Sequence, residues 1–578
     1  MIKRLLPYLR GYRLQAVMAP LWVSIETVCE LILPLLMAAI IDDGIQKGDM
    51  GAIGKNGALM VLVSMLSLAG GILAARFAAQ AAQGLGANIR KAEFEQISAF
   101  SFGDIDRFST ASLVTRLTND VTQIQNMVSM CLRMLVRSAV MMLVAIIVAC
   151  SISVKLAGYV LIILPLVVLI VGGMMRMVGP LFGIMQKKLD GLNQVIQENL
   201  IGTRVVKAFV RQDYERGKFK RANDELTQAG LNAILRILAM MPLMMLGMNL
   251  ATVLILYNGG HMVLGGELEI GQLSSILTYI FNILFSVMMV GFALLSYTRA
   301  KASAGRIFAV LDTVPAIADG PERESETGRG LVEFRDVSFK YAAGGTGDDV
   351  LRHISFTALP GQTVAIVGGT GSGKSTLVNL IPRFYDVTAG QVLVDGRDVR
   401  DYRLDDLRGR IGMVLQNNIL FSGTIRENLL WGKRDATEEE MIQAAKNAQA
   451  YDFIMSFPDG FDTRLEQGGV NVSGGQKQRL CIARAMLRHP EVLILDDSTS
   501  AVDSTTEGLI RQSFAENLKD TTVILIAQRI SSVRTADRIL VLEDDTIVAS
   551  GTHDELMETS RVYQEIYYSQ QEGVKDNG

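Results

Sequence analysis

Six long apolar runs occupy the N-terminal half of this 578-residue chain and limit its possible folds more than any other feature. They lie at about 15–41, 56–82, 134–152, 155–180, 237–264 and 272–298. A helix needs about 20 mostly apolar residues to cross a bilayer core. A large soluble helical bundle is the alternative, but six nearly charge-free runs exceed what amphipathic core helices require. We therefore predict six transmembrane helices.

Charge divides the chain into two parts. Residues 1–320 carry 28 Lys and Arg against 20 Asp and Glu, whereas residues 321–578 carry 28 against 39. The net charges of +8 and −11 indicate parts that lie in different solvents. The basic excess lies between apolar runs and forms no single patch, so nucleic acid is not an expected partner. The four cysteines are sparse and exclude a disulfide framework.

Basic residues also predict the orientation in the membrane. They precede the first run and fill the segments between the second and third runs and between the fourth and fifth. The positive-inside rule then places both termini in the cytoplasm of a membrane that we expect to be the bacterial inner membrane. Each internal segment is about 50 residues long and helically patterned. We expect short helices near 110–117 and 202–209 to contact a domain below the membrane.

Glu26 and Glu30 lie one helical turn apart in the first run. Carboxylates are costly in lipid and should face a protein interior or an aqueous cavity. They either face a substrate or neutralise Arg133 or Arg137, and the sequence leaves both readings open. The methionines of the fifth and sixth runs, such as Met248 and Met289, either form an adaptable binding surface or only pack helices.

The second part follows a polar segment at 314–330 and alternates short β-rich runs with helical ones, which predicts a mainly parallel α/β sheet. Within it, TVAIVGGTGSGKST places a P-loop between a strand and a helix. Backbone N–H groups there would surround phosphates, Lys374 would reach the outer phosphates, and Ser375 would ligate Mg²⁺. Asp496 ends an apolar strand, where an acid that holds Mg²⁺ is expected. The predicted loop residues are Gly368, Gly369, Thr370, Gly371, Ser372, Gly373, Lys374, Ser375 and Thr376.

A short motif downstream resembles the signature sequence of ABC transporter ATPases, and it stands between the P-loop and LILDD as it does in that family. The motif consists of Val472, Ser473, Gly474, Gly475 and Gln476. The resemblance implies that Tyr341 stacks on adenine and that Gln416 is the Q-loop glutamine. Gln416 would then join Ser375 and Asp496 around Mg²⁺, and Asp503 would belong to the D-loop.

The resemblance covers essentially the whole chain and implies an exporter-type half-transporter. It implies a membrane all-α domain, whose six helices extend into the cytoplasm, fused to an α/β P-loop ABC ATPase domain. The expected boundaries are 1–313 for the membrane domain, 314–330 for a linker, 331–570 for the ATPase domain and 571–578 for a tail. In this family two halves dimerise, and each ATP lies between one P-loop and the other chain's signature.

Two positions depart from the family pattern. Asp497 stands where the family usually has the glutamate that activates water, and Gln528 stands where it has a switch histidine. The Asp497 side chain is one methylene shorter than glutamate, so its carboxylate would be retracted by about an ångström or more. Misplacement on that scale can cost about 100-fold in rate. Gln528 can hydrogen-bond a phosphate but cannot carry a proton or a positive charge. The site is therefore expected to bind ATP and to hydrolyse it poorly.

This pattern is similar to one subunit of the heterodimeric bacterial multidrug exporters. The resemblance implies a second half-transporter with intact Glu and His as partner, ATP and Mg²⁺ as cofactors, and a small hydrophobic or amphipathic compound, a drug or lipid, as substrate. Export across the bilayer would proceed by alternating access. A homodimer with two slow sites, a homodimeric lipid or peptide exporter, and an importer of metal chelates on the same scaffold are the alternatives.

Overall fold

The computed structural model describes residues 1–321, 329–341, 348–498 and 501–575, apart from some side chains of α8 and α10, those of Leu295 and Ser504, and those of 571–575. The chain divides into two compact units. One unit comprises Met1–Gln96 and Leu113–Thr313, and the other comprises Ile97–Ser112 and Val314–Gly578. Each unit is described by itself.

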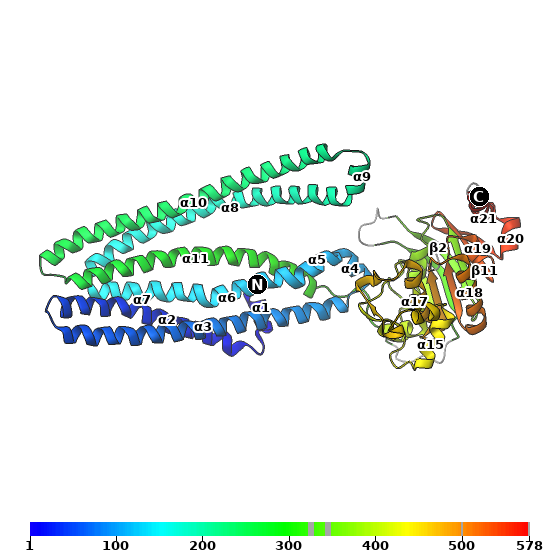
Figure 1. Ribbon diagram of the computed structural model, residues 1–578, viewed down its shortest axis with the longest axis horizontal. Helices are drawn as coiled ribbons and strands as arrows, with labels where there is room; N and C mark the ends of the chain where they lie inside the picture. Colours follow the sequence, from blue (N-terminus) through cyan, green and yellow to red (C-terminus); the bar gives the residue numbers. More distant parts are fainter. Residues whose placement is uncertain (322–328, 342–347, 499–500, 576–578) are drawn as a thin grey trace. The chain divides into compact units, whose positions relative to one another are not determined.

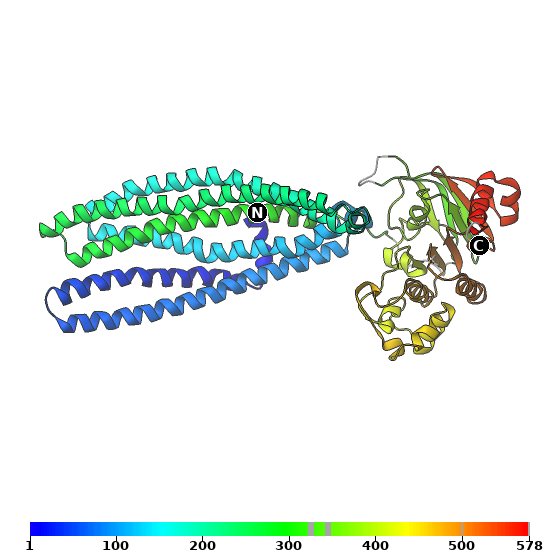
Figure 2. The same ribbon diagram turned by 45° about the horizontal axis from the view of Figure 1, so that its top comes forward.

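The first unit is built of long helices that run side by side (Figures 1 and 2). Its principal helices are α1 (Ile2–Leu5), α2 (Arg13–Ala39), α3 (Met50–Ser98), α5 (Thr110–Thr115), α6 (Val121–Met130), α7 (Val136–Ile152), α8 (Val154–Ile201), α9 (Thr203–Ala208), α10 (Gln212–Leu264) and α11 (Ile270–Leu311). Figure 1 shows α8 and α10 as a pair joined by the short α9. The helical segments therefore include all six predicted apolar runs.

Four segments are long and apolar enough to cross a membrane among the residues whose side chains are described. They are Arg13–Ile45, Met50–Ser98, Thr110–Ile152 and Ile270–Leu311. The fourth and fifth predicted runs lie in α8 and α10, part of whose side chains fall outside the described residues.

Helices α2 and α11 approach each other closely. The buried Tyr279 hydroxyl donates to the carbonyl oxygen of Leu31 at 2.6 Å. At the start of α11, the Gly271 N–H donates to Asp42 Oδ1 at 2.6 Å. A Cβ on Gly271 would lie 2.5 Å from the Ala38 carbonyl oxygen, so only glycine permits this approach. An unpaired polar group is costly in an apolar environment, and these bonds pair the Tyr279 hydroxyl and the Gly271 N–H.

The structure corrects the position of the first short helix. It lies at α4 (Phe102–Phe108) and not at 110–117, where the next helix, α5, has already begun. Ser101 and Asp104 form a capping box that starts α4, and Ser109 ends it with a φ of 57°. Polar capping residues set these bounds. The spacing of apolar residues, on which the prediction rested, does not reveal them. The second short helix, α9, forms within the predicted range.

The second unit contains a six-stranded sheet in the order β12-β11-β3-β10-β9-β6 and a four-stranded antiparallel sheet in the order β2-β1-β4-β5. The strands of the larger sheet are β3 (Thr363–Gly368), β6 (Ile411–Val414), β9 (Val492–Asp496), β10 (Thr522–Ile526), β11 (Arg538–Glu543) and β12 (Thr546–Gly551). The others are β1 (Val332–Phe339), β2 (Leu351–Ala358), β4 (Ala389–Val394), β5 (Arg397–Asp398) and the separate pair β7 (Gly423–Thr424) and β8 (Arg464–Leu465). All neighbours in the larger sheet are parallel except the edge pair β11–β12.

Helices surround these sheets, as Figure 1 shows for the second unit. They are α12 (Lys374–Asn379), α13 (Leu404–Arg410), α14 (Ile425–Leu429), α15 (Glu438–Asn447), α16 (Tyr451–Met455), α17 (Gly474–Met486), α18 (Ser504–Asn517), α19 (Ile530–Val533), α20 (His553–Thr559) and α21 (Arg561–Lys575). Every residue of β9 and β10 is buried, which explains their continuous apolar runs. The carboxyl ends of β3, β9 and β10 share one edge of the sheet, where ligands bind in open α/β folds.

Helix α4 packs within this second unit. The Phe102 ring lies 4.5 Å from the Phe384 ring, centroid to centroid. The Tyr385 hydroxyl donates to Asp106 Oδ2 at 2.9 Å. A segment between two membrane runs is thereby part of the second unit.

Candidate nucleotide site and membrane cavity

The P-loop connects β3 to α12 in a conformation that requires glycine. Gly373 has a φ of 83°, and a Cβ there would lie 2.7 Å from the Val350 carbonyl oxygen. A Cβ on Gly368 would lie 2.3 Å from the Leu542 carbonyl oxygen. Glycines therefore let the backbone turn tightly and present N–H groups to a phosphate.

Lys374 lies inside this loop. Its ammonium donates to the carbonyl oxygens of Gly368 at 3.0 Å and Gly369 at 2.6 Å. Burial lowers the pKa of the ammonium, and the nearby carboxylates of Asp496 and Asp497 oppose that shift. The loop thus holds a positive charge among backbone groups that bind phosphate.

Asp496 and Ser375 are brought together from the ends of β9 and the P-loop. The Ser375 hydroxyl donates to Asp496 Oδ1 at 3.0 Å. Asp496 is 4% exposed, and burial raises the pKa of its carboxyl. A hydroxyl and a carboxylate are the hard oxygen ligands that Mg²⁺ prefers, so this pair fits the predicted metal. Gln416, the third predicted ligand, lies in an exposed loop after β6.

Tyr341 lies beside the start of α12. Its hydroxyl is 2.9 Å from Thr376 Oγ1, and its ring contacts Phe339 and Tyr385 edge to face. An aromatic ring held next to the P-loop can stack on a base. The remaining loop residues, Thr370, Gly371 and Ser372, line a cavity of about 360 Å³ that α21 also borders.

Asp497 and Gln528, the two departures from the family pattern, contact each other. Gln528 Nε2 donates to Asp497 Oδ2 at 2.8 Å. Asp497 has a φ of 49°, a left-handed conformation that is uncommon for a residue other than glycine. Burial raises the pKa of its carboxyl. The carboxylate therefore accepts a hydrogen bond from the residue at the predicted switch position.

The signature motif begins helix α17. Ser473 is its N-cap, and its hydroxyl accepts from the N–H of Gln476 while Gln476 accepts from the N–H of Ser473. A Cβ on Gly475 would lie 2.9 Å from the Ala501 carbonyl oxygen, so this glycine lets the next loop approach. Val472 is buried, whereas Ser473 and Gly474 are exposed. Among the described residues, no hydrogen bond joins Ser473 to the P-loop of its own chain.

Asp503 is the N-cap of helix α18. Its side chain accepts from the N–H of Thr506 at the start of α18. Gln478 Oε1 accepts from the N–H of Ala501, which ties the signature helix to this segment. The predicted D-loop is thereby held against the signature.

No sequence pattern marks Gln570, although it contacts the switch position. Its Nε2 donates to the carbonyl oxygen of Gln528 at 2.7 Å, and its Oε1 accepts from the N–H of Ile530 at 2.9 Å. The partners are 42 and 40 residues apart in the chain. Only the docking of α21 brings them together.

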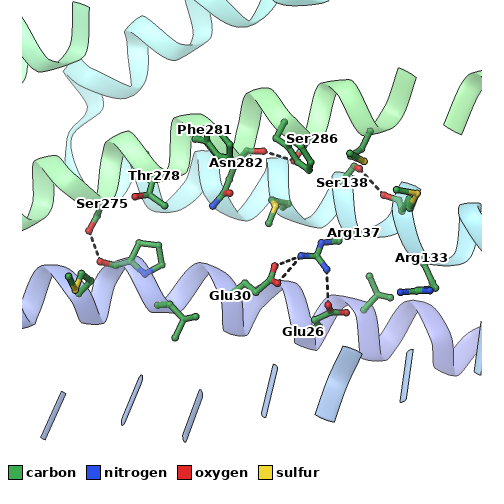
Figure 3. A pocket seen from close by; sticks show the side chains of 18 of the residues that line it. Glu26, Glu30, Arg133, Arg137, Ser138, Ser275, Thr278, Phe281, Asn282 and Ser286 are labelled. Atoms are coloured by element: carbon green, nitrogen blue, oxygen red, sulfur yellow. Dashed lines mark hydrogen bonds and ion pairs between the residues drawn. The ribbon is translucent and has the colours of Figure 1, made fainter. Parts of the chain in front are cut away.

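The first unit contains a cavity of about 810 Å³ between α2, α7 and α11. Figure 3 shows Arg137 bonded to Glu26 and Glu30, with Ser275 and Thr278 further along the cavity. Much of the wall is apolar, with Met141, Phe281 and Phe285 among the lining residues. Large, mostly apolar cavities with a few polar groups are typical of sites for small molecules.

Arg137 connects the two carboxylates of the first run. Its guanidinium donates to Glu26 Oε1 at 2.7 Å and to both oxygens of Glu30 at 2.6 and 2.7 Å. All three side chains line the cavity, as does Arg133 (Figure 3). The ion pairs confirm that these carboxylates neutralise Arg137, and their place on the cavity wall leaves contact with a substrate as a prediction.

These features define a membrane protein with an ATP-binding domain of the P-loop class. The family model described as ABC transporter transmembrane region matches residues 18–288, and the model described as ABC transporter matches residues 351–500. The chain belongs to the ABC transporter family and is of the exporter type. It combines a helical transmembrane region with a C-terminal α/β ABC ATPase domain.

Known proteins resemble the chain along most of its length. The uncharacterized ABC transporter ATP-binding protein YfiB of Bacillus subtilis is 41% identical over 573 residues, 98% of each chain. The ATP-dependent lipid A-core flippase of Syntrophus aciditrophicus is 35% identical over 491 residues, 84% of this chain and 80% of that protein. A solved bacterial Atm1-family ABC exporter with ATP bound is 25% identical, with a TM-score of 0.82, and the match covers 97% of this chain and 99% of that chain.

Proposed function

We propose that this chain is one half of a heterodimeric exporter of hydrophobic or amphipathic small compounds, drugs or lipids, and that its own ATP site hydrolyses slowly. The observation that carries the proposal is the hydrogen bond between Gln528 and Asp497. It occupies the two positions where this family has a glutamate and a histidine. The flippase relative supports lipids as one substrate class.

The Asp497–Gln528 pair weakens hydrolysis in two ways. The shorter Asp497 side chain retracts the carboxylate that would activate water, and general-base catalysis requires hydrogen-bond reach to that water. The Gln528 amide donates one of its two N–H groups to Asp497, which leaves the other for a terminal phosphate. A neutral amide also cannot stabilise developing negative charge as a protonated imidazole does.

Most of the groups that would bind ATP lie outside this pair. The glycine-rich loop, the half-buried Lys374 ammonium and the Tyr341 ring all remain to hold phosphate and base. Ser375, Asp496 and Gln416 would hold Mg²⁺, which supplies positive charge against the phosphate oxygens. The site therefore retains its binding function.

Exposed surfaces support the requirement for a second chain. Ser473 and Gly474 of the signature are exposed at the start of α17, where a partner's nucleotide would contact them. At the α8–α10 end, Val205 and Phe209 are 60% and 73% exposed. Apolar side chains at the tip of a helical hairpin are suited to a protein contact. We expect that contact to be the partner's ATPase domain.

The mechanism follows from these assignments. A compound enters the cavity between two sets of membrane helices, and ATP binding brings the two ATPase domains together. The short helices α4 and α9 transmit that closure to the membrane helices, which open outward. Hydrolysis at the partner's competent P-loop, completed by Ser473 of this chain, then separates the domains.

Transport by inside-out vesicles tests the function. We expect ATP to drive accumulation of a fluorescent lipophilic dye such as ethidium inside vesicles that contain the chain and a co-encoded half-transporter. The same vesicles without ATP serve as control for background leakage. ATP-driven loss of preloaded dye or metal chelate would instead favour an importer on the same scaffold.

Purification of the chain alone tests the heterodimer. We expect ATP hydrolysis to be slow for the chain alone and to rise strongly when it is purified with the co-encoded half. Comparable turnover in both preparations would favour a homodimer and contradict the heterodimer.

A further inference from the structure

The switch segment from Gln528 to Ile530 is held by a side chain from the C-terminal helix. One amide, that of Gln570, binds the backbone at both ends of this segment, donating at 2.7 Å and accepting at 2.9 Å. A glutamine amide has both a donor and an acceptor, so it can clamp two backbone groups that lie two residues apart.

The clamp replaces a helix cap. The N–H groups in the first turn of a helix have no partner within the helix. Helix α19 begins after Arg529, which provides no side-chain cap, and Gln570 accepts from the N–H of Ile530 instead. The backbone that carries the Gln528 side chain therefore depends on α21 for its position.

Helix α21 is itself anchored in the core of the ATPase unit. Tyr563 is fully buried, and its hydroxyl is 2.8 Å from His553 Nδ1. Val562 and Ile566 pack against the same core and form a wall of the cavity that the P-loop borders. The helix thus adjoins both the P-loop and the switch segment.

We propose that Gln570 is a positioning residue that holds Gln528 where its amide can face the terminal phosphate of ATP. Through this residue the C-terminal helix sets how well the site distinguishes ATP from ADP. The inference rests on the proposed function, because it uses the role of Gln528 at the terminal phosphate.

Nucleotide binding by the full-length transporter in lipid nanodiscs tests the proposal. Photolabelling with 8-azido-ATP and 8-azido-ADP, followed by separation of the chains, reports on the P-loop of this chain. We expect Gln570→Ala to weaken ATP binding about fivefold, the effect of one or two neutral hydrogen bonds, and to leave ADP binding unchanged. ADP lacks the terminal phosphate, so loss of a contact to that phosphate should weaken only ATP binding. A general loss of structure would instead weaken the binding of both nucleotides.

Two further variants separate positioning from packing. Gln570→Glu keeps the size of the side chain but cannot donate to the Gln528 carbonyl, so it should also weaken ATP binding selectively. Gln564→Ala is the matched control, because Gln564 lies on the same helix and donates to the Met557 carbonyl at 2.7 Å, away from the switch segment. It should leave the ratio of ATP to ADP binding unchanged.

The Gln528→Ala variant distinguishes failure of this inference from failure of the proposed function. Selective loss of ATP binding in Gln528→Ala, but not in the two Gln570 variants, would overturn the positioning role alone. Equal loss of ATP and ADP binding in the Gln570 variants would overturn it as well. Unchanged ATP binding in Gln528→Ala would overturn the role of Gln528 and the inference that depends on it.

Discussion

Gln528 donates a hydrogen bond of 2.8 Å to the carboxylate of Asp497, and these residues come from segments that follow neighbouring parallel strands, β10 and β9. In the proposed function, Asp497 is a shorter carboxylate in place of the family's glutamate and Gln528 is an amide in place of its histidine. Because they contact each other, they act as a pair, and their substitutions should be coupled.

Restoring both groups should activate the site. We expect Asp497→Glu combined with Gln528→His to raise hydrolysis at this chain's P-loop by about 10- to 100-fold, since the water-activating carboxylate regains its reach. Each single substitution should achieve much less. The measurement is ATP turnover of a complex whose partner carries an inactivated P-loop. Unchanged turnover in the double variant would mean that another feature limits hydrolysis.

Removal of the P-loop lysine should weaken nucleotide binding at this chain alone. Lys374→Ala deletes an ammonium that we expect to bind the phosphates, and loss of charge-assisted bonds predicts a fall in ATP affinity of about 10- to 100-fold. Lys433→Ala is the control, because Lys433 pairs with Glu440 on the surface of the same unit. Equilibrium binding of a fluorescent ATP analogue measures both. Equal affinities in the two variants would contradict the assignment of Lys374.

The signature serine should act on the partner's site. Ser473→Ala is expected to lower the turnover of the complex about tenfold or more, because the serine is expected to contact phosphate in trans. It also removes an N-cap, which costs about 1 kcal/mol of stability. Thr437→Ala removes the corresponding cap of α15 and controls for that cost. The trans assignment fails if both variants turn over ATP at the same rate.

Helix α4 should couple the ATPase unit to the membrane helices. Phe102→Ala removes the ring that contacts Phe384, and we expect substrate-stimulated hydrolysis to fall about threefold or more while ATP binding is retained. Tyr385→Phe deletes only the hydroxyl that binds Asp106 and should have a smaller effect. Stimulated and basal hydrolysis are measured in nanodiscs. Full stimulation in Phe102→Ala would contradict a coupling role for this contact.

Arg137 should stabilise the membrane unit. Arg137→Gln leaves Glu26 and Glu30 with a neutral partner in the cavity, and loss of charge-assisted hydrogen bonds predicts destabilisation of about 1.5–3 kcal/mol. Arg133→Gln, which alters a cavity arginine outside this ion-pair cluster, is the matched control. Thermal unfolding of the purified transporter compares the two. Equal melting temperatures would show that the ion pairs contribute little.

The membrane runs and the ATP-binding motifs could be predicted because each depends on residues close together in the chain. Apolar runs of sufficient length become helices in lipid, where every backbone polar group must be paired internally. The P-loop glycines, Lys374 and Ser375 form one contiguous segment between a strand and a helix. The position of α4 was missed because capping at Ser101 and Ser109 ends an otherwise helical pattern.

The two-part architecture, the family and the two unusual residues, Asp497 and Gln528, could all be recognised from local sequence patterns. The contacts of the functional side chains could not, because they depend on tertiary packing. In the structure, Arg137 and not Arg133 pairs with the carboxylates of α2. Gln570 contacts Gln528, which lies 42 residues earlier in the chain. Such choices depend on how helices and strands pack, since packing places side chains from distant segments within hydrogen-bond reach.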